Sequence, residues 1–167
     1  MRRRVLIFGA AAVLAGGIGG VLIAHAHGSG DSSGSAMVAK ATAMMGFDLS
    51  KTVHSFTDTA DGGIQEVVAD SPDDASDIAA IRAHLSRIAG QFTAGDFSDP
   101  AAMHGADMPG LAQMQSGADR MQITYSQLPT GGRIAFRSDD PAQVEAIHRY
   151  FAAQRHDHSM PGMGMGH

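Results

Sequence analysis

One order of local signals occurs twice along this chain of 167 residues. In each copy a Gly-Gly pair begins a strand-like segment, an aspartate follows the second glycine by seven residues, and a proline then begins a helical segment. The aspartates are Asp70 and Asp139, and the prolines are Pro72 and Pro141. This order predicts an α+β fold of the form ββα–ββα, with a four-stranded antiparallel sheet and two helices on one of its faces. It fits an internal duplication, and it equally fits two independent copies of a common unit.

Alternation and turn residues predict the two hairpins. Residues 51–57 and 64–69 are predicted to be strands joined at Asp61-Gly62, because glycine takes a positive φ without a steric penalty. Residues 121–128 and 133–138 are predicted to form the second hairpin across Pro-Thr-Gly-Gly. In the first strand the alternation leaves open whether His54 faces the core or the solvent.

Apolar residues at helical spacing predict the two helices. The first is predicted to have Ser71 as its N-cap and to end near Gly95. Its apolar stripe consists of Ile78, Ile81, Leu85, Ile88 and Phe92. The second helix begins with Pro141 and turns Val144, Ile147 and Phe151 inward. Glycine, proline and aspartate in the segment between the halves predict an irregular His/Met loop, with two short helical turns at most.

The N-terminal residues predict export. Three arginines precede twenty residues without a charge, and Ala24-His25-Ala26 then offers a small-x-small cleavage site. The run also has the length of a bilayer span. We therefore expect residues 1–26 to be a signal peptide or an N-terminal anchor, and the mature protein to be periplasmic or otherwise extracytoplasmic. Residues 27–47 are interpreted as a flexible linker, 48–156 as the α+β domain, and 157–167 as a flexible Met/His-rich tail.

The composition excludes several kinds of function. There is no cysteine, so disulfides, thiolate zinc sites and iron–sulfur ligation are excluded. A net charge of −5, without a basic stripe, argues against nucleic acid as a partner. The sequence contains no nucleophile elbow, phosphate-binding loop, His-Glu-x-x-His or dinucleotide-binding pattern, so we expect no enzyme.

The C-terminal residues combine imidazoles with thioethers. Thioether sulfur is a soft ligand that prefers Cu(I), and imidazole suits both Cu(I) and Cu(II). The alternative is a solvated end with no ligand. The candidate ligands of the tail are His156, His158, Met160, Met163, Met165 and His167.

The loop between the halves repeats this chemistry with Met103, His104 and Met108. Here the alternative is a methionine that fills a gap in the core. His84 and His148 lie at the edge of the two helical stripes, at matching places in the two copies, and are further candidate ligands. The alternative for each is a hydrogen bond to a backbone carbonyl.

Several segments resemble a poorly characterised family of small exported bacterial proteins. They are "GDFSDPAAMHGADMPGL", "IRAHLSRIA", "AIHRYFAAQRHDH" and "DGGIQEVV", within residues 53–158. Members sometimes carry a label of aspartate carbamoyltransferase, but this chain is too short for that enzyme and lacks its Ser-Thr-Arg-Thr phosphate loop. The resemblance marks residues 96–111 and 148–158 as signature segments and implies no particular activity.

These observations predict an exported copper-binding protein, either a chaperone, a buffer or a copper-resistance factor, which prefers Cu(I) and accepts Cu(II). Its partners would be the metal ion and a copper transporter or cuproenzyme, with the membrane contacted only through an uncleaved N-terminal segment. Two alternatives are a haem- or small-ligand-binding sensory module and a non-catalytic interaction domain of the cell envelope.

Overall fold

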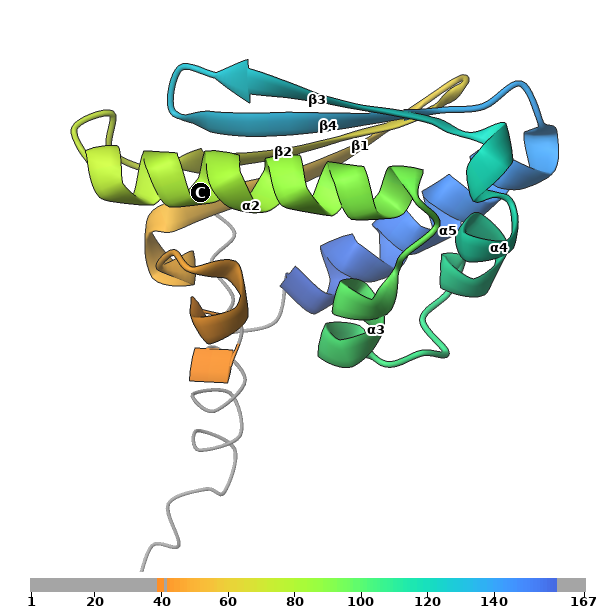
Figure 1. Ribbon diagram of the computed structural model, residues 1–167, viewed down its shortest axis with the longest axis horizontal. Coiled ribbons are helices and arrows are strands. Elements are labelled where there is room, and N and C mark those ends of the chain that lie inside the picture. The colour runs from red at the N-terminus through yellow and green to blue at the C-terminus, as the bar shows by residue number, and fades with distance from the viewer. Residues whose placement is uncertain (1–38, 41, 159–167) are drawn as a thin grey trace, which may run out of the picture.

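The computed structural model describes residues 39–40 and 42–158 and has an α+β fold (Figure 1). Residues 42–45 are helical. The elements that follow are η1 (Leu49–Lys51), β1 (Thr52–Thr59), β2 (Gly62–Ala69), α2 (Ala75–Thr93), α3 (Ser98–His104), α4 (Leu111–Ser116), η2 (Ala118–Arg120), β3 (Gln122–Leu128), β4 (Gly131–Arg137) and α5 (Pro141–His158). Among these residues no helix is long and apolar enough to cross a bilayer.

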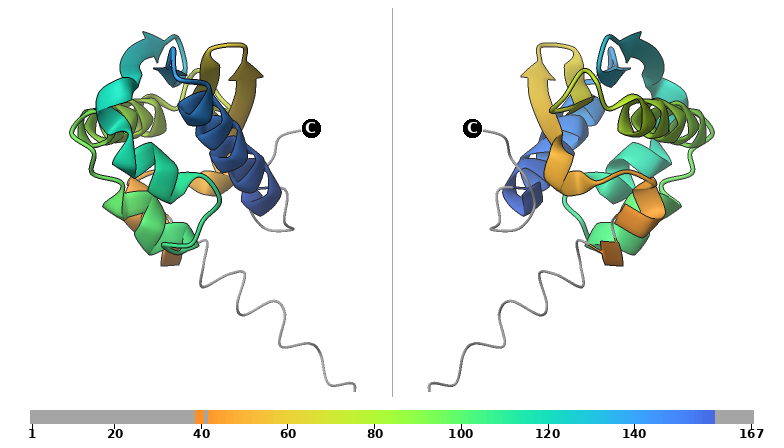
Figure 2. Two further views of the ribbon diagram at one scale, coloured as in Figure 1. Left: turned by 90° about the vertical axis from the view of Figure 1, so that its right-hand side faces the viewer. Right: turned by 90° about the vertical axis from the view of Figure 1, so that its left-hand side faces the viewer.

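The four strands form one antiparallel sheet, as the sequence predicts, and their order in the sheet is β1-β2-β4-β3. Helices α2 and α5 both lie against the same face of this sheet (Figures 1 and 2). Each helix packs mainly on the hairpin of the other half: α2 lies against β3 and β4, and α5 lies against β1 and β2.

The two hairpins are equivalent in register. The last pair of the first hairpin is Thr59 with Gly62, and the last pair of the second is Leu128 with Gly131, each 69 residues further along. Both hairpins therefore have a two-residue loop and the same alternation of faces. Gly62 has a φ of 148°, which explains the glycine at this strand start.

One side chain from each long helix binds the turn of the opposite hairpin. His148 on α5 donates from Nε2 to the carbonyl oxygens of Thr59, at 3.0 Å, and Gly62, at 2.8 Å. Arg82 on α2 donates from Nη2 to the carbonyl oxygen of Leu128, at 2.7 Å, and from Nε to that of Gly131, at 3.2 Å. Because these carbonyls are equivalent in the two halves, Arg82 and His148 act as equivalent clasps.

The core lies between the sheet and the two helices. Its fully buried members include Val67, Ile134 and Phe136 from the sheet, and Ile81, Leu85, Ile147 and Phe151 from the helices. The helix α5 approaches β2 closely at Gly63, where an added Cβ would lie 2.3 Å from Cε2 of Phe151. A side chain at this position would therefore push the helix away from the sheet.

The structure differs from the sequence-based boundaries in two places. Phe47, predicted to belong to the linker, is 2% exposed and joins the core. Helix α2 begins after Asp74, whose side chain accepts from the amide of Asp77, because Ser71 instead accepts from Asp73 within a turn. The segment between the halves contains the short helices α3 and α4, where the sequence allows two short helical turns. The proposed leader and most of the tail lie outside the described residues.

Candidate functional site

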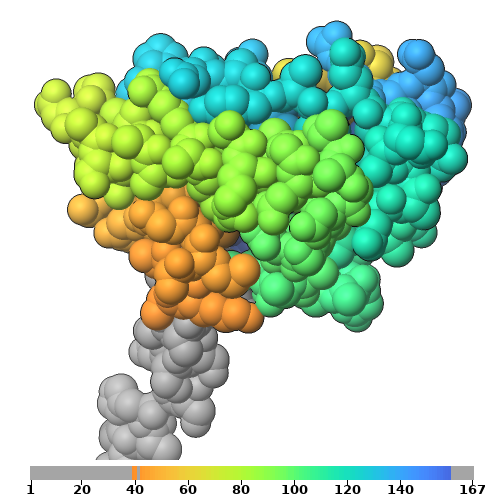
Figure 3. Space-filling model, viewed as in Figure 1, coloured from red at the N-terminus to blue at the C-terminus, as the bar shows by residue number. Residues whose placement is uncertain are grey.

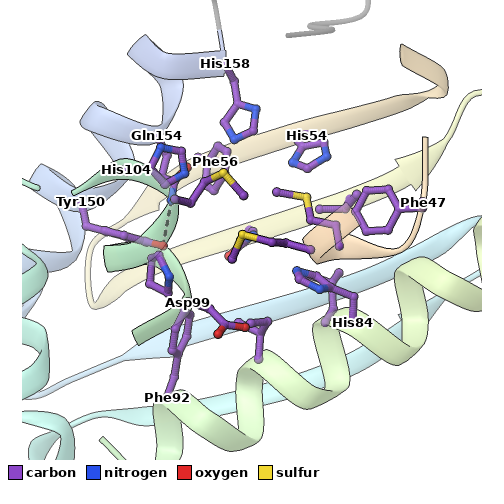
Figure 4. A pocket seen from close by; sticks show the side chains of 18 residues that line it. Phe47, His54, Phe56, His84, Phe92, Asp99, His104, Tyr150, Gln154 and His158 are labelled. Carbon is purple, nitrogen blue, oxygen red and sulfur yellow. Dashed lines mark hydrogen bonds between the residues drawn. The ribbon is translucent and has the colours of Figure 1, made fainter. Parts of the chain in front are cut away.

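A cavity of about 70 Å³ lies where the N-terminal segment, β1, β2, α2, α3 and the end of α5 meet (Figure 4). In Figure 3 the orange N-terminal segment and the green α2–α3 region meet on this side of the molecule, and blue atoms of α5 are visible in the narrow gap between them. The nitrogen and sulfur donors that line the cavity are Met44, Met45, His54, His84, Met103, His104 and His158. They come from segments that are far apart in the sequence, so only the fold brings them together.

His54 is one of the two most deeply buried imidazoles. Strand β1 alternates so that Thr52, His54 and Phe56 all face the helices, and His54 is 4% exposed. Its Nε2 atom has no hydrogen-bond partner among the described residues. Burial lowers the pKa of His54 to about 3, with smaller contributions from His158 and His84, so the ring is neutral. A neutral imidazole can offer a lone pair to a ligand in the cavity.

His158 lies against His54 at the end of α5. The two rings stack with their centroids 4.7 Å apart, and His158 is itself 4% exposed. Burial lowers the pKa of His158 to about 4, and the neighbouring His104 lowers it further. The two stacked rings are therefore both uncharged at neutral pH.

His104 forms the wall between the cavity and an outer groove that Asp107, Met108, Arg149 and Asp157 help to line. Its Nδ1 atom lies 2.8 Å from Oδ2 of Asp157, which is on the groove side. The centroid of its ring lies 6.2 Å from that of His158. The carboxylate thus fixes the orientation of a third imidazole at the edge of the cavity.

His84 differs from the other three imidazoles in its partner. Its Nδ1 atom lies 3.2 Å from Nη2 of Arg87, and Arg87 is held in turn by Asp99 at 2.6 Å. Burial and then the charge of Arg87 lower the pKa of His84 to about 4, with Asp99 acting in the opposite sense. Because a guanidinium only donates, this nitrogen must accept.

The thioethers complete the lining. Met44, Met45 and Met103 are each partly buried, and sulfur atoms (yellow in Figure 4) lie in the space between the labelled histidines. Among the described residues no group of three or more His, Asp or Glu side chains is arranged to hold a metal ion. Metal binding in this cavity would therefore depend on sulfur donors together with imidazoles.

The structure brings four of the sequence-predicted residues to this cavity and places three elsewhere. His84, Met103, His104 and His158 line it. Met108 is buried in the core beside the groove, and the exposed His156 lines that groove. His148 binds the turn of the first hairpin, and its counterpart at the turn of the second hairpin is Arg82. His84 and His148 therefore do not occupy matching places. Met160, Met163, Met165 and His167 lie outside the described residues.

Sequence reasoning missed three donors: His54, Met44 and Met45. The signal for His54 was present, since Phe56 and Val67, the neighbours that share its face, are both apolar. No signal assigned the two methionines, because they precede the first strand in a segment without a clear period.

Comparison with protein-family models, with curated proteins and with solved structures finds no significant match to this chain. The family resemblance therefore stays a prediction.

Proposed function

We propose that this chain is an exported copper-binding protein that takes copper as Cu(I) and serves as a chaperone, a buffer or a copper-resistance factor. The observation that carries the proposal is the cavity, which gathers imidazole and thioether donors and contains a buried imidazole nitrogen that has no hydrogen-bond partner in the part of the chain the structure describes. A buried polar atom without a hydrogen bond destabilises a protein, which suggests that the atom has another role.

The chemistry of the donors favours a soft cation. Thioethers bind Cu(I) well, and imidazoles accompany them in many copper sites. Harder cations such as Mg²⁺ and Ca²⁺ prefer oxygen ligands, and Zn²⁺ sites use thiolate, imidazole or carboxylate. Met103 with a pair of imidazoles from among His54, His104 and His158 would form the inner part of this site.

The electrostatics of the cavity also favour a single positive charge. His54, His84 and His158 are neutral, the thioethers are neutral, and the nearest carboxylate lining the cavity, Asp99, is paired with Arg87. The desolvation penalty of an ion rises with the square of its charge, so a monovalent ion is favoured over a divalent one in a cavity where no described residue of the lining offers an unpaired carboxylate.

The size of the cavity favours an ion over an organic ligand. Pockets that hold drug-sized molecules have volumes of roughly 300–1,000 Å³. The cavity has a volume of about 70 Å³, which suits an ion or one or two waters. A haem or sensory ligand would require the core to open.

The C-terminal residues have a second role in the proposal. Met160, Met163, Met165 and His167 follow directly on His158, which lines the cavity. We propose that they capture the ion before it enters the domain. Deleting residues 159–167 should then lower the affinity for Cu(I) only in part, because the cavity keeps its donors.

Anaerobic titration of the full chain with Cu(I), in competition with a chromogenic chelator, tests the proposal. Replacing Met103 by leucine keeps the volume but removes the sulfur, and should lower the affinity at least about tenfold. Met108→Leu is the matched control, since Met108 lies in the same segment but does not line the cavity. A wild-type chain that fails to compete, or equal losses in both variants, would refute the proposed site.

A further inference from the structure

Two of the cavity histidines, His84 and His104, have hydrogen-bond partners of opposite kinds, a guanidinium and a carboxylate. We propose that Asp157 is a positioning residue that holds His104 with its Nε2 lone pair available to the metal, and that Arg87 keeps His84 out of the ligand set. This inference rests on the proposed function, and it names which side chains act at that site.

The hydrogen bond of His104 decides which of its ring nitrogens can bind a metal. Its Nδ1 atom lies 2.8 Å from a carboxylate oxygen, and the ionised carboxylate of Asp157 can only accept. In the neutral ring the proton is therefore on Nδ1, and Nε2 keeps its lone pair. Asp157 lines the outer groove and not the cavity, so the nitrogen it binds is on the groove side of a ring that lines both.

Asp157 also affects the strength of the ligand. Metal-binding histidines commonly donate their second ring N–H to a carboxylate, which fixes the ring and raises its basicity. The carboxylate further supplies a negative charge close to an otherwise neutral set of donors. Its side chain is 35% exposed whereas that of His104 is 8% exposed, so the charge stays partly solvated while the ring it orients is buried.

The contact of His84 with Arg87 has the opposite consequence for its lone pair. Arg87 is a permanent donor, so Nδ1 of His84 is an acceptor and the neutral ring carries its proton on Nε2. The lone pair of His84 is thus already used. Arg87 is itself fixed by hydrogen bonds to Asp99, at 2.6 Å, and to Gln91, at 2.8 Å. These bonds hold its guanidinium in place beside His84.

Two measurements separate these roles. Long-range ¹H–¹⁵N correlation spectra of the metal-free protein should show His104 with its proton on Nδ1 and His84 with its proton on Nε2. In Cu(I) competition, Asp157→Ala should weaken binding about 10- to 100-fold, which is the range found for such outer partners. Asp157→Asn, which keeps an acceptor but removes the charge, should fall between this variant and the wild type.

Asp107→Asn and His84→Leu are the controls. Asp107 is a carboxylate of the same outer groove, but the carboxylate that binds His104 is that of Asp157, so Asp107→Asn should change the affinity for Cu(I) less than about threefold. His84→Leu should have an equally small effect, whereas His104→Leu should match or exceed Asp157→Ala.

The outcomes distinguish this inference from the proposed function. If the wild type binds Cu(I) but Asp157→Ala binds equally well, or His84→Leu is as damaging as His104→Leu, the ligand assignment is wrong and the copper proposal stands. The opposite proton positions in the spectra would also overturn the assignment. A wild type that does not bind Cu(I) refutes both.

Discussion

The two hairpins have the same register but enclose different interiors. At equivalent positions, 69 residues apart, the first hairpin has His54 and Gln65 where the second has Ile123 and Ile134. The first pair lines the cavity, and the buried Nε2 of His54 and Oε1 of Gln65 have no partner in the described residues. Ile134 is completely buried in the core. One scaffold thus supports a solid core beneath the second hairpin and a cavity with imidazole and thioether donors beneath the first, and this difference singles out the cavity as the candidate site.

Lowering the pH should destabilise the region around the cavity. We expect this to give the largest change in the free energy of unfolding. The pKa of His54 is lowered to about 3, and those of His84 and His158 to about 4, from 6.5. Below pH 6.5 the unfolded chain therefore binds more protons than the folded one, so stability falls as the pH falls from 6.5 toward 4. Each of the three should cost about 2 kcal/mol between pH 7 and pH 5.

Urea unfolding of the metal-free protein at a series of pH values measures this loss. In His54→Leu the slope should be about a third smaller, because one of the three groups is gone. A free energy of unfolding that stays constant between pH 7 and pH 5 would show that the imidazoles are not buried in neutral form.

Truncating a core side chain beneath the second hairpin should give the next largest loss of stability. Phe136→Ala removes a fully buried ring on β4 that packs against Phe92 and Phe151. Such a cavity in a well-packed core costs about 3–5 kcal/mol. Thermal and urea unfolding measure the loss, and a cost below about 1 kcal/mol would indicate that this half is no better packed than the other.

Making the cavity resemble the solid half should stabilise the protein. His54→Leu replaces an unpaired buried nitrogen by carbon, and removing such a group is worth about 1–3 kcal/mol. We expect the metal-free variant to gain stability at pH 7 and to lose affinity for Cu(I). A destabilised variant would mean that His54 has a structural partner, and that the contrast between the halves has no functional origin.

Removing either clasp residue should give the smallest losses of stability. The two variants also test whether the clasps are equivalent in the two halves. Arg82→Ala removes a charged donor from the second turn and should cost about 2 kcal/mol, while His148→Ala removes a neutral donor from the first and should cost about 1 kcal/mol. Hydrogen exchange at the turn amides should rise only in the hairpin whose clasp is lost. A response in the other hairpin would contradict the assignment of each clasp to one turn.

The fold could be predicted from the sequence because its signals are local. The Asp61-Gly62 turn, the stripe from Ile78 to Phe92 and the prolines before the helices each determine a nearby piece of backbone, and together they give the sheet and its two helices. The helix start was placed three residues too early, because Ser71 and Asp74 are both good caps and only tertiary packing chooses between them.

The site could be predicted only in part, because it is not local. Met103 and His104 stood out as neighbours within one segment, and His158 as part of a dense group of donors. Burial of His54 and the inward position of Met44 depend on how distant segments pack. Periodicity placed His148 correctly at the edge of its helix, but it could not show that two carbonyls from the first hairpin take up its N–H.

Because α2 covers the second hairpin and α5 covers the first, the two halves are intertwined rather than adjacent. A chain cut between the halves would leave each hairpin without the helix that shields it, so neither fragment should be stable alone, whereas the two together should reassemble. The molecule should accordingly unfold in a single cooperative transition, and the cavity, built from both halves, should be lost in that same step.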